Sequence, residues 1–318
     1  MFEDKFDIAV LIPCYNEGTT IADVVNGFKL HLPKARIYVY DNNSTDDTAS
    51  NAMRSGATVV WEKHQGKGNV VRRMFSDVDA DLYLMVDGDG TYPPECAPDL
   101  LRILVSECVD MVVGVRCYKE NYIGRNGHIL GNTIFNKFYR VIFGTGFTDI
   151  FSGYRAFSQR FVKSFPAVSN GFEVETEMSV YASFLKIPFQ EFHLEYRQRP
   201  QGSYSKLATI SDGIKVLWKF LVFFKEMRPL TFFGMIGGGG GVISIYLIVT
   251  FLSAFNQEEF SFHKVQFSIA LILMFASFVS FTLGLIFDSI ANSKMEKLRM
   301  LYMSIDGFSS KNDTRKKL

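Results

Sequence analysis

The segment VDGDGTYP, residues 86–93, follows an apolar run that begins at residue 82. This continuous run predicts a buried strand over residues 82–86. Asp87 and Asp89 follow directly, and Gly88 between them has no side chain, so a ligand can approach the backbone closely. Two carboxylates at one tight bend suit Mg²⁺ or Mn²⁺, which prefer oxygen ligands and are completed by phosphates and waters.

A polar turn and a calcium-binding loop are the two other interpretations of this segment. A calcium loop of the EF-hand type needs Gly at its sixth position and Glu at its twelfth. Counting from Asp87, these positions hold Tyr92 and Pro98, which excludes such a loop. The residues alone leave the polar turn open, and the surrounding pattern favours the metal site.

The first half of the chain alternates strand and helix patterns. Strands are predicted at residues 8–12, 36–40, 58–61, 82–86 and 111–115, and helices between them at residues 19–30, 44–55, 68–77 and 98–106. Strands separated by helices predict an α/β fold, with a mainly parallel Rossmann-like sheet and helices on both faces. Ligands of such sheets bind beyond the carboxyl ends of the strands, where the polar segments of this chain fall.

The following part of the chain is more irregular. Helices are predicted at residues 132–143 and 175–185, a strand at residues 188–195, and a loop at residues 144–155. Residues 199–206 are polar and rich in turn-forming residues.

Polar residues also follow other predicted strands. Asp41 is suited to accept a hydrogen bond from a base imide, with Asn43 beside the ribose, although a strand-to-helix turn is an ordinary use of these residues. Lys67 stands between two glycines at a helix start, where a flexible cation suits a phosphate. The spacing is not that of a Walker loop, because position 61 holds Trp where that loop needs Gly.

Two stretches predict membrane spans. Residues 230–255 and 265–287 contain no charged residue, and each exceeds the roughly 20 residues that a spanning helix needs. Lys and Arg flank both stretches, so the positive-inside rule places both termini in the cytoplasm and residues 256–264 outside. Residues 207–228 carry an apolar stripe set against lysines, which favours a helix in the membrane interface over an ordinary surface helix.

These patterns divide the 318-residue chain into four parts. They are a cytoplasmic domain (residues 1–206), an interfacial helical segment (207–228), two spans (229–290) and a basic cytoplasmic tail (291–318). The net charge of +1 gives no support to nucleic-acid binding, and the four cysteines lack metal-ligand spacing. Five glycines at residues 237–241 allow close packing of the first span on the second span or on another copy, which is compatible with a homo-oligomer.

Several motifs follow one another in a characteristic order. They are LIPCYNEGTTIADVV (11–25), VYDNNSTDDT (39–48), GKGNVVR (66–72), VDGDGTYPPE (86–95) and TDIFSGYRAF (148–157). In this order they resemble the inverting family-two glycosyltransferases with the A-type fold. FEVETEM (172–178), RPQGSYSKL (199–207) and the two spans resemble the polyprenyl-phosphate glycosyltransferases, the group of the dolichyl-phosphate mannose synthases and bactoprenol glucosyltransferases. The resemblance covers about residues 6–290.

The resemblance implies roles for individual residues. Pro13, Tyr15 and Glu17 line the nucleotide pocket, Asp41 meets the base, and Asp87 and Asp89 hold the metal against the diphosphate. The predicted nucleotide-binding residues are Pro13, Tyr15, Glu17, Asp41, Asn43, Lys67 and Gly88. Arg116 and Arg199 meet the phosphate of the lipid acceptor, and Lys206 joins them. Asp149, Ser152 and Arg155 lie near the sugar or the acceptor.

One departure from the family pattern concerns the metal. Members with the sequence DADLQ place Gln two residues after the second Asp as a third ligand, whereas this chain has Thr91, which supplies a hydroxyl or leaves the position to water. The expected donor is a nucleotide sugar, with UDP preferred over GDP and glucose or N-acetylglucosamine as first choices. A lipid monophosphate is already anionic and needs no general base.

Other functions fit parts of the pattern. A membrane glycosyltransferase that acts on a hydroxyl acceptor is one, although the Gln-x-x-Arg-Trp motif of processive synthases is absent. An inactive, membrane-anchored subunit that binds a nucleotide sugar is another, although both aspartates are present. A nucleotidyltransferase is disfavoured, because such enzymes open with a Gly-rich loop and this chain has Pro13-Cys14-Tyr15-Asn16-Glu17 there.

Overall fold

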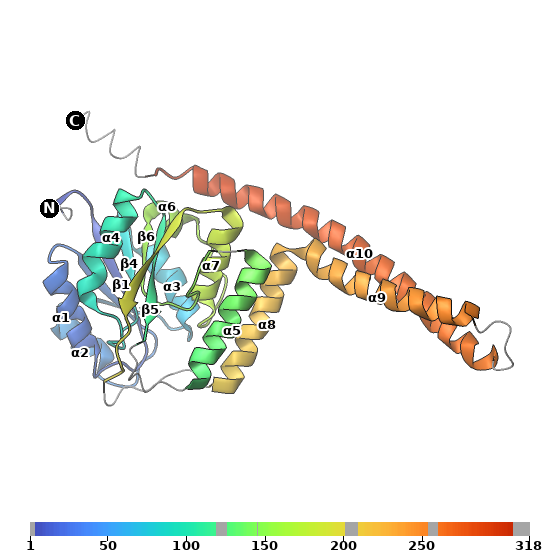
Figure 1. Ribbon diagram of the computed structural model, residues 1–318. Helices are drawn as coiled ribbons and strands as arrows, with labels where there is room; N and C mark the ends of the chain where they lie inside the picture. The colour runs from blue at the N-terminus through green and yellow to red at the C-terminus, as the bar shows by residue number, and fades with distance from the viewer. Residues whose placement is uncertain (1–3, 119–125, 145, 201–208, 254–259, 308–318) are drawn as a thin grey trace. The chain divides into compact units, whose positions relative to one another are not determined.

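A computed structural model describes residues 4–118, 126–144, 146–200, 209–253 and 260–307 of the chain (Figure 1). The chain forms two compact units. The first comprises Met1–Val216 and Leu298–Leu318, and the second comprises Leu217–Lys297.

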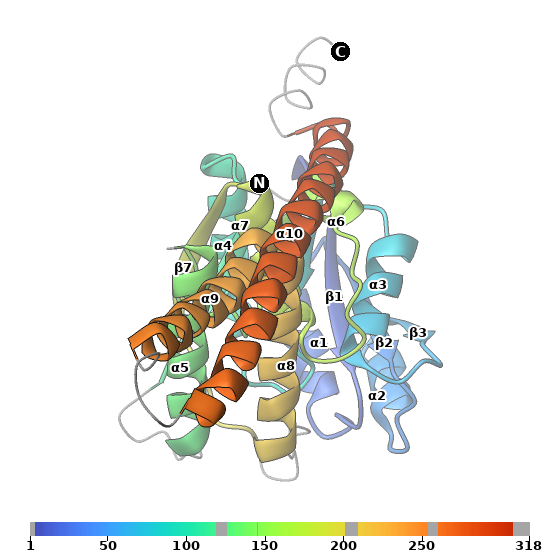
Figure 2. The same cartoon turned by 90° about the vertical axis from the view of Figure 1, so that its right-hand side faces the viewer.

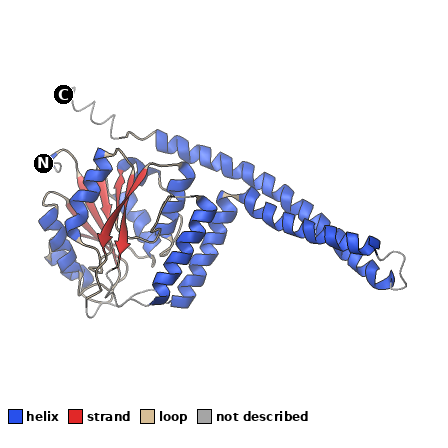
Figure 3. Cartoon of the chain, viewed as in Figure 1, coloured by secondary structure: helices blue, strands red, loops and turns tan. Residues whose placement is uncertain are grey.

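The first unit is built on a seven-stranded sheet with the order β3-β2-β1-β4-β6-β5-β7. Figure 3 draws the strands in red. The strands are β1 (Ile8–Cys14), β2 (Arg36–Asp41), β3 (Thr58–Trp61), β4 (Leu82–Met85), β5 (Met111–Cys117), β6 (Arg155–Ser158) and β7 (Phe189–Glu195). Neighbouring strands are parallel except at β6, which is antiparallel to β4 and β5. The predicted α/β fold with a mainly parallel sheet is confirmed.

Helices cover both faces of this sheet (Figures 1 and 2). They are α1 (Ile21–His31), α2 (Thr48–Arg54), α3 (Lys67–Asp77), α4 (Ala97–Ser106), α5 (Asn126–Phe143), α6 (Gln159–Ser164) and α7 (Val174–Leu185), with a 3₁₀ turn, η2 (Pro94–Cys96), before α4. The alternate residues Ile8, Val10 and Ile12 of β1 pack with α1 and α4 in one buried cluster. Helices α3, α6 and α7 lie on the opposite face. Because successive strand side chains point to opposite faces, the fully apolar β1 can be buried on both.

The structure corrects several element boundaries. The predicted loop at residues 144–155 ends where β6 begins, and neither this four-residue strand nor α6 was predicted. Helix α2 begins at Thr48 rather than at residue 44, because side chains hold the preceding turn: the Ser44 amide donates to Asp41 and the Thr48 amide to Asp46. Helix α5 begins at Asn126 rather than at residue 132.

The second unit contains helix α9 (Pro229–Ser253) and most of helix α10 (Phe260–Met303). Both helices are long and apolar enough to cross a membrane. Helix α8 (Thr209–Met227) precedes them. The hydroxyls of Ser244 and Ser280 join the two helices, donating to the Ala270 carbonyl at 2.7 Å and the Phe233 carbonyl at 2.9 Å. Helix α10 continues to Met303, well beyond the predicted end of the second span at residue 287.

The last part of α10 belongs to the first unit and is tied to it by polar contacts. The Asp110 carboxylate, completely buried before β5, accepts hydrogen bonds from Ser158, Arg160 and the Tyr302 hydroxyl. The Arg160 guanidinium also lies 4.4 Å from the centre of the Tyr302 ring. A buried carboxylate needs such donors, and Tyr302 is supplied from the far end of the chain.

Candidate functional site

Asp87 and Asp89 lie just beyond the carboxyl end of β4, as the sequence predicts, and β4 is the central strand of the sheet. Asp89 is only 3% exposed, and its Oδ1 accepts hydrogen bonds from the Thr91 hydroxyl at 2.6 Å and the Thr91 amide at 3.1 Å. Its Oδ2 lies 2.5 Å from Nη2 of Arg199. Burial and the charge of Asp87 raise the pKa of Asp89, and Arg199 opposes this rise.

Asp87 pairs with a different cation. Nζ of Lys67, the first residue of α3, lies 2.5 Å from Oδ1 of Asp87 and also bonds Oε1 of Glu175, near the start of α7. Burial by itself lowers the pKa of Lys67, but the two carboxylates outweigh it and raise the pKa. The ammonium is therefore protonated near neutral pH.

The donor set at Asp87 and Asp89 fits a divalent cation that is shared with a bound molecule. Two carboxylates lie next to each other, and both are balanced here by side-chain cations. No group of three or more His, Cys, Asp or Glu side chains that could hold a metal alone occurs in the described part of the chain. A cation at these aspartates would take its other ligands from phosphates and water, as Mg²⁺ and Mn²⁺ commonly do. The Thr91 hydroxyl donates to Asp89, and its contact with a metal stays a prediction.

The predicted base pocket lies at the ends of β1 and β2, where Pro13 pairs with Tyr40 and Cys14 with Asp41. Asp41 is buried; its Oδ2 accepts from the Ser44 amide at 3.2 Å, and its Oδ1 has no partner among the described residues. A buried acceptor without a partner is costly and is suited to a donor that arrives with a ligand. Glu17 is buried nearby and Tyr15 is 38% exposed.

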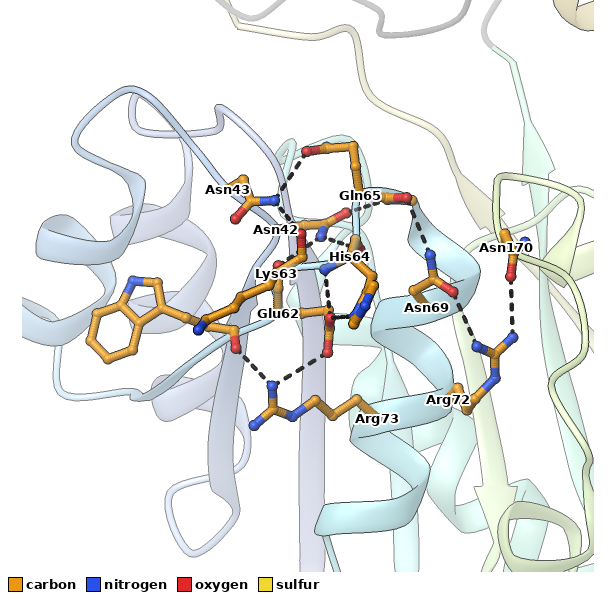
Figure 4. A network of polar contacts seen from close by, with 12 residues as sticks. Asn42, Asn43, Glu62, Lys63, His64, Gln65, Asn69, Arg72, Arg73 and Asn170 are labelled. Carbon is orange, nitrogen blue, oxygen red and sulfur yellow. Dashed lines mark hydrogen bonds and ion pairs between the residues drawn. The ribbon is translucent and has the colours of Figure 1, made fainter.

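Residues 62–66 form a loop held by two asparagines (Figure 4). The Asn42 amide donates to the carbonyls of Glu62 and His64, at 3.0 and 2.8 Å, and its carbonyl accepts from the Gly66 amide at 2.7 Å. Asn43 donates to the Lys63 carbonyl at 2.7 Å. The sequence interpretation assigned Asn43 to the ribose and gave Asn42 no role. The structure uses both side chains to hold the loop that ends at Lys67, and the ribose contact stays a prediction.

Arg116, at the carboxyl end of β5, forms a bidentate pair with Asp149. Its Nε and Nη2 each lie 2.7 Å from a carboxylate oxygen, and its guanidinium lies 5.6 Å from the centre of the Tyr196 ring. Burial raises the pKa of Asp149, but the charge and hydrogen bonds of Arg116 outweigh this and lower it. Because this pair uses Nε and Nη2, a phosphate would have to meet the Nη1 side of the guanidinium or replace Asp149.

Residues 149–155 form a turn that passes beside Asp87. The Ser152 hydroxyl donates to the Gly114 carbonyl at 2.5 Å, and the completely buried Arg155 donates to the carbonyls of Ile150 and Ser152, each at 2.9 Å. A Cβ at Gly153 would lie 2.4 Å from Oδ2 of Asp87. Ser152 and Arg155 thus hold the turn against the site, and their contact with sugar or acceptor stays a prediction. Lys206 lies outside the described residues.

Sequence reasoning missed two parts of the site. Glu175 shares the ammonium of Lys67 with Asp87, although its motif had been noted only as a family resemblance. Three tyrosines also gather beside Arg116: Tyr196 packs edge-on against Tyr92 and Tyr118, with ring centres 5.2 and 5.5 Å apart. No local spacing relates residues this far apart in the chain, so only the resemblance could have singled out Glu175.

The chain is similar in sequence to several known proteins. The sequence model of Glycosyl transferase family 2 matches residues 9–165. Protein RfbJ of Shigella flexneri is 60% identical over 117 residues, which are 37% of this chain and 89% of that protein. Glycosyltransferase AglJ of Haloferax volcanii is 36% identical over 233 residues, which are 72% of this chain and 76% of that protein.

Solved structures of the same fold are also similar. Glucosyl-3-phosphoglycerate synthase of Mycobacterium tuberculosis, in complex with Mn²⁺, UDP-glucose and phosphoglyceric acid, superposes with a TM-score of 0.57 at 22% identity. The match covers 70% of this chain and 81% of that chain. At this identity the likeness concerns the fold, which is the A-type glycosyltransferase fold.

Proposed function

We propose that this chain, which belongs to glycosyl transferase family 2, transfers a sugar from a UDP-linked donor to a polyprenyl phosphate. Family membership gives the coarser statement, that of a glycosyltransferase that uses a nucleotide sugar. The acceptor, inversion at the anomeric carbon, the divalent cation and the membrane location belong to the proposal. One contact carries it: Arg199, assigned to the acceptor phosphate, lies 2.5 Å from Asp89, assigned to the metal of the donor.

The donor half of the site supports UDP with Mg²⁺ or Mn²⁺. The free Oδ1 of Asp41 is suited to accept a hydrogen bond from a base imide, and Lys67 lies within reach of a phosphate at Asp87. Asp87 and Asp89 would hold the cation, which stabilises the leaving diphosphate when it is bound. The solved synthase of the same fold contains Mn²⁺ and UDP-glucose, which is why UDP and this type of metal are preferred.

The acceptor half of the site supports a lipid phosphate. Arg116 lies at the carboxyl end of β5, and Arg199 lies between Asp89 and Glu17, with its Nη1 3.9 Å from Oε1 of Glu17. Guanidinium groups bind phosphate oxygens well. A phosphate acceptor is already anionic, so the protein needs to neutralise and orient it rather than remove a proton from it. Attack on the sugar from the side opposite the diphosphate inverts the anomeric carbon.

The two apolar helices support a membrane location for this chemistry. Helices α9 and α10 are long enough to span a bilayer, and basic residues flank the predicted spans on the domain side. By the positive-inside rule, both termini and the first unit face the cytoplasm. A soluble nucleotide sugar and a lipid phosphate of the inner leaflet would then meet on the same side.

A donor panel tests the proposal. The full chain in detergent receives a polyprenyl phosphate, Mn²⁺ and, in separate reactions, UDP-glucose, UDP-N-acetylglucosamine, UDP-galactose or GDP-mannose, and the lipids are analysed by mass spectrometry. We expect one donor to give a glycosyl-phosphoryl lipid, and Asp89→Asn to lower its formation by about a thousandfold or more. Asp99→Asn, an exposed carboxylate on α4, is the matched control and keeps full activity. Hydrolysis of a donor without any lipid product would contradict the phosphate acceptor.

A further inference from the structure

A buried lysine stands between two carboxylates that have different surroundings. The side chain of Lys67 is 11% exposed; that of Asp87 is 29% exposed and that of Glu175 only 5%. Asp87 therefore faces the open part of the site, and Glu175 lies behind the lysine. In the proposed function Asp87 binds a divalent cation, whereas Glu175 has no role so far.

The backbone holds Glu175 and Lys67 together. The Gly68 amide donates to the Asn170 carbonyl at 3.0 Å, and a Cβ at Gly68 would lie only 2.1 Å from the Ser169 carbonyl oxygen. The start of α3 therefore fits tightly against residues 167–170, which lead into α7. This close approach requires glycine, because any side chain would overlap the neighbouring backbone.

Two side chains fasten the same segment. Arg72, one turn into α3, donates to the carbonyls of Ala167, Val168 and Ser169 and to the Asn170 side chain; the last of these contacts is visible in Figure 4. Glu177, on α7, accepts from the amides of Val168 and Ser169 at 2.8 and 2.7 Å. The pair of Lys67 and Glu175 is therefore built into the junction of α3 and α7.

The charges explain why such a partner is useful. Asp87 and Glu175 both pair with Lys67, and Asp89 pairs with Arg199, whose Nη1 also lies 3.9 Å from Oε1 of Glu17. A divalent cation at Asp87 repels the ammonium of Lys67, which must then give up its contact with Asp87. A buried ammonium left without a counter-ion is strongly unfavourable, so displacement of Lys67 needs a second carboxylate that stays in place.

We infer that Glu175 is a positioning residue that retains Lys67 when Asp87 binds a divalent cation, so that Lys67 can give up its contact with Asp87 and still keep a partner. This inference rests on the proposed metal site at Asp87 and Asp89. It assigns Glu175 no contact with sugar, nucleotide or acceptor. Glu175 influences metal binding only by holding Lys67.

The test measures Mn²⁺ affinity rather than activity. Full-length protein in detergent is titrated with Mn²⁺ in the presence of UDP, and free Mn²⁺ is measured by electron paramagnetic resonance. Glu175→Gln and Glu175→Asp should each weaken Mn²⁺ binding by about tenfold, since groups in direct contact couple by this order of magnitude. Glu175→Asp keeps the charge but is one methylene too short to hold Lys67. Glu107→Gln and Lys29→Met, both exposed, are matched controls with wild-type affinity.

A double-mutant cycle then separates retention of Lys67 from a direct charge effect. In a Lys67→Met background, Glu175→Gln should change the Mn²⁺ affinity by less than about twofold, because no lysine is left to hold. Wild-type affinity of Glu175→Asp, or an undiminished effect of Glu175→Gln without Lys67, would overturn the inference and leave the proposed function intact. If the wild-type protein binds Mn²⁺ no more tightly than the Asp89→Asn variant does, both the proposed metal site and this inference are wrong.

Discussion

At Gly153 the lack of a side chain leaves room for the carboxylate of Asp87. A Cβ there would lie 2.4 Å from Oδ2 and 2.8 Å from Cγ of Asp87, whose other oxygen is held by Lys67. The glycine of the SGYR segment is therefore a condition for the position of a proposed metal ligand. A glycine is needed at position 153 because of this contact with Asp87, which comes from another part of the chain. The turn that contains Gly153 does not itself require glycine.

Gly153→Ala should displace Asp87 and lower kcat by about a hundredfold, the usual effect of a misplacement of about 1 Å in an active site. Gly171→Ala is a matched control, because its new Cβ would meet only the end of the half-exposed Glu173 side chain, which can move away. Steady-state kinetics and thermal unfolding of both variants check this. Equal losses of activity in the two variants would contradict the role of Gly153.

The pair of Arg116 and Asp149 predicts a pH dependence of stability. The pKa of Asp149 is lower in the folded protein than in the unfolded chain, so its ionised form contributes stability above about pH 4, and this contribution is lost as the pH falls through the folded pKa. Asp149→Asn leaves the buried Arg116 without a counter-ion and should cost about 3 kcal/mol near neutral pH. The difference in free energy of unfolding between the wild type and the variant should become smaller below about pH 4. Thermal unfolding across this range measures it, and a constant gap would refute the assignment.

At the scale of elements, close approach of backbone decides the contacts between helices. In the second unit a Cβ at Gly237 of α9 would lie 2.8 Å from the Ser277 carbonyl oxygen of α10, whereas Gly234, Gly238 and Gly241 have nothing within 4 Å. The sequence had predicted close packing from the five glycines at residues 237–241. Of these five, Gly237 and Gly240 lie against Ser277 of α10, and Gly237 is the one that faces its backbone.

Gly237→Ala should therefore destabilise the helix pair by about 1–3 kcal/mol through overpacking. Gly238→Ala, one residue further along the same helix, should be neutral or slightly stabilising, because alanine is a better helix former than glycine. Thermal unfolding in the same detergent compares the two variants. A larger loss at Gly238 than at Gly237 would show that these glycines pack differently.

At the scale of the whole molecule, residues at the end of α10 contact the rest of the first unit. Tyr302 contacts Asp110 and Arg160, and the Arg299 guanidinium donates to the Leu185 carbonyl at the end of α7 at 3.1 Å. Asp110 directly precedes β5, and Arg116 lies at the other end of that strand, about 20 Å away for a strand of this length. These contacts therefore support the sheet from the end opposite the site.

Tyr302→Ala should destabilise the first unit by about 2 kcal/mol, because Asp110 loses a hydrogen bond and Arg160 loses the ring beneath it. Met303→Ala, which removes an exposed side chain from the next position, is the control and should change stability by less than about 0.5 kcal/mol. Unfolding followed by tryptophan fluorescence measures both. Affinity for UDP should not change in either variant, because the site lies at the other end of the strands.

The sequence by itself determined the α/β class, most helices and strands, and the two apolar helices. It also placed Asp41, Asp87 and Arg116 at the carboxyl ends of their strands. These features follow from local signals: apolar runs, periodicity and polar residues at strand ends. The sequence missed the four-residue strand β6 and the short helix α6, and it misplaced the starts of helices α2 and α5. At these places the local signal is weak, or side-chain contacts hold a turn.

The tertiary structure decided which side chains share a contact. It inserted the antiparallel β6 between β4 and β5, which brings Gly153 against Asp87. It also placed Glu175 behind Lys67 and directed Arg155 into the protein. Pairs such as Lys67 with Glu175 are separated by more than a hundred residues, and no spacing along the chain encodes them. They arise because burial of the apolar faces brings α3 and α7 together, and only then do the charges at their ends find partners.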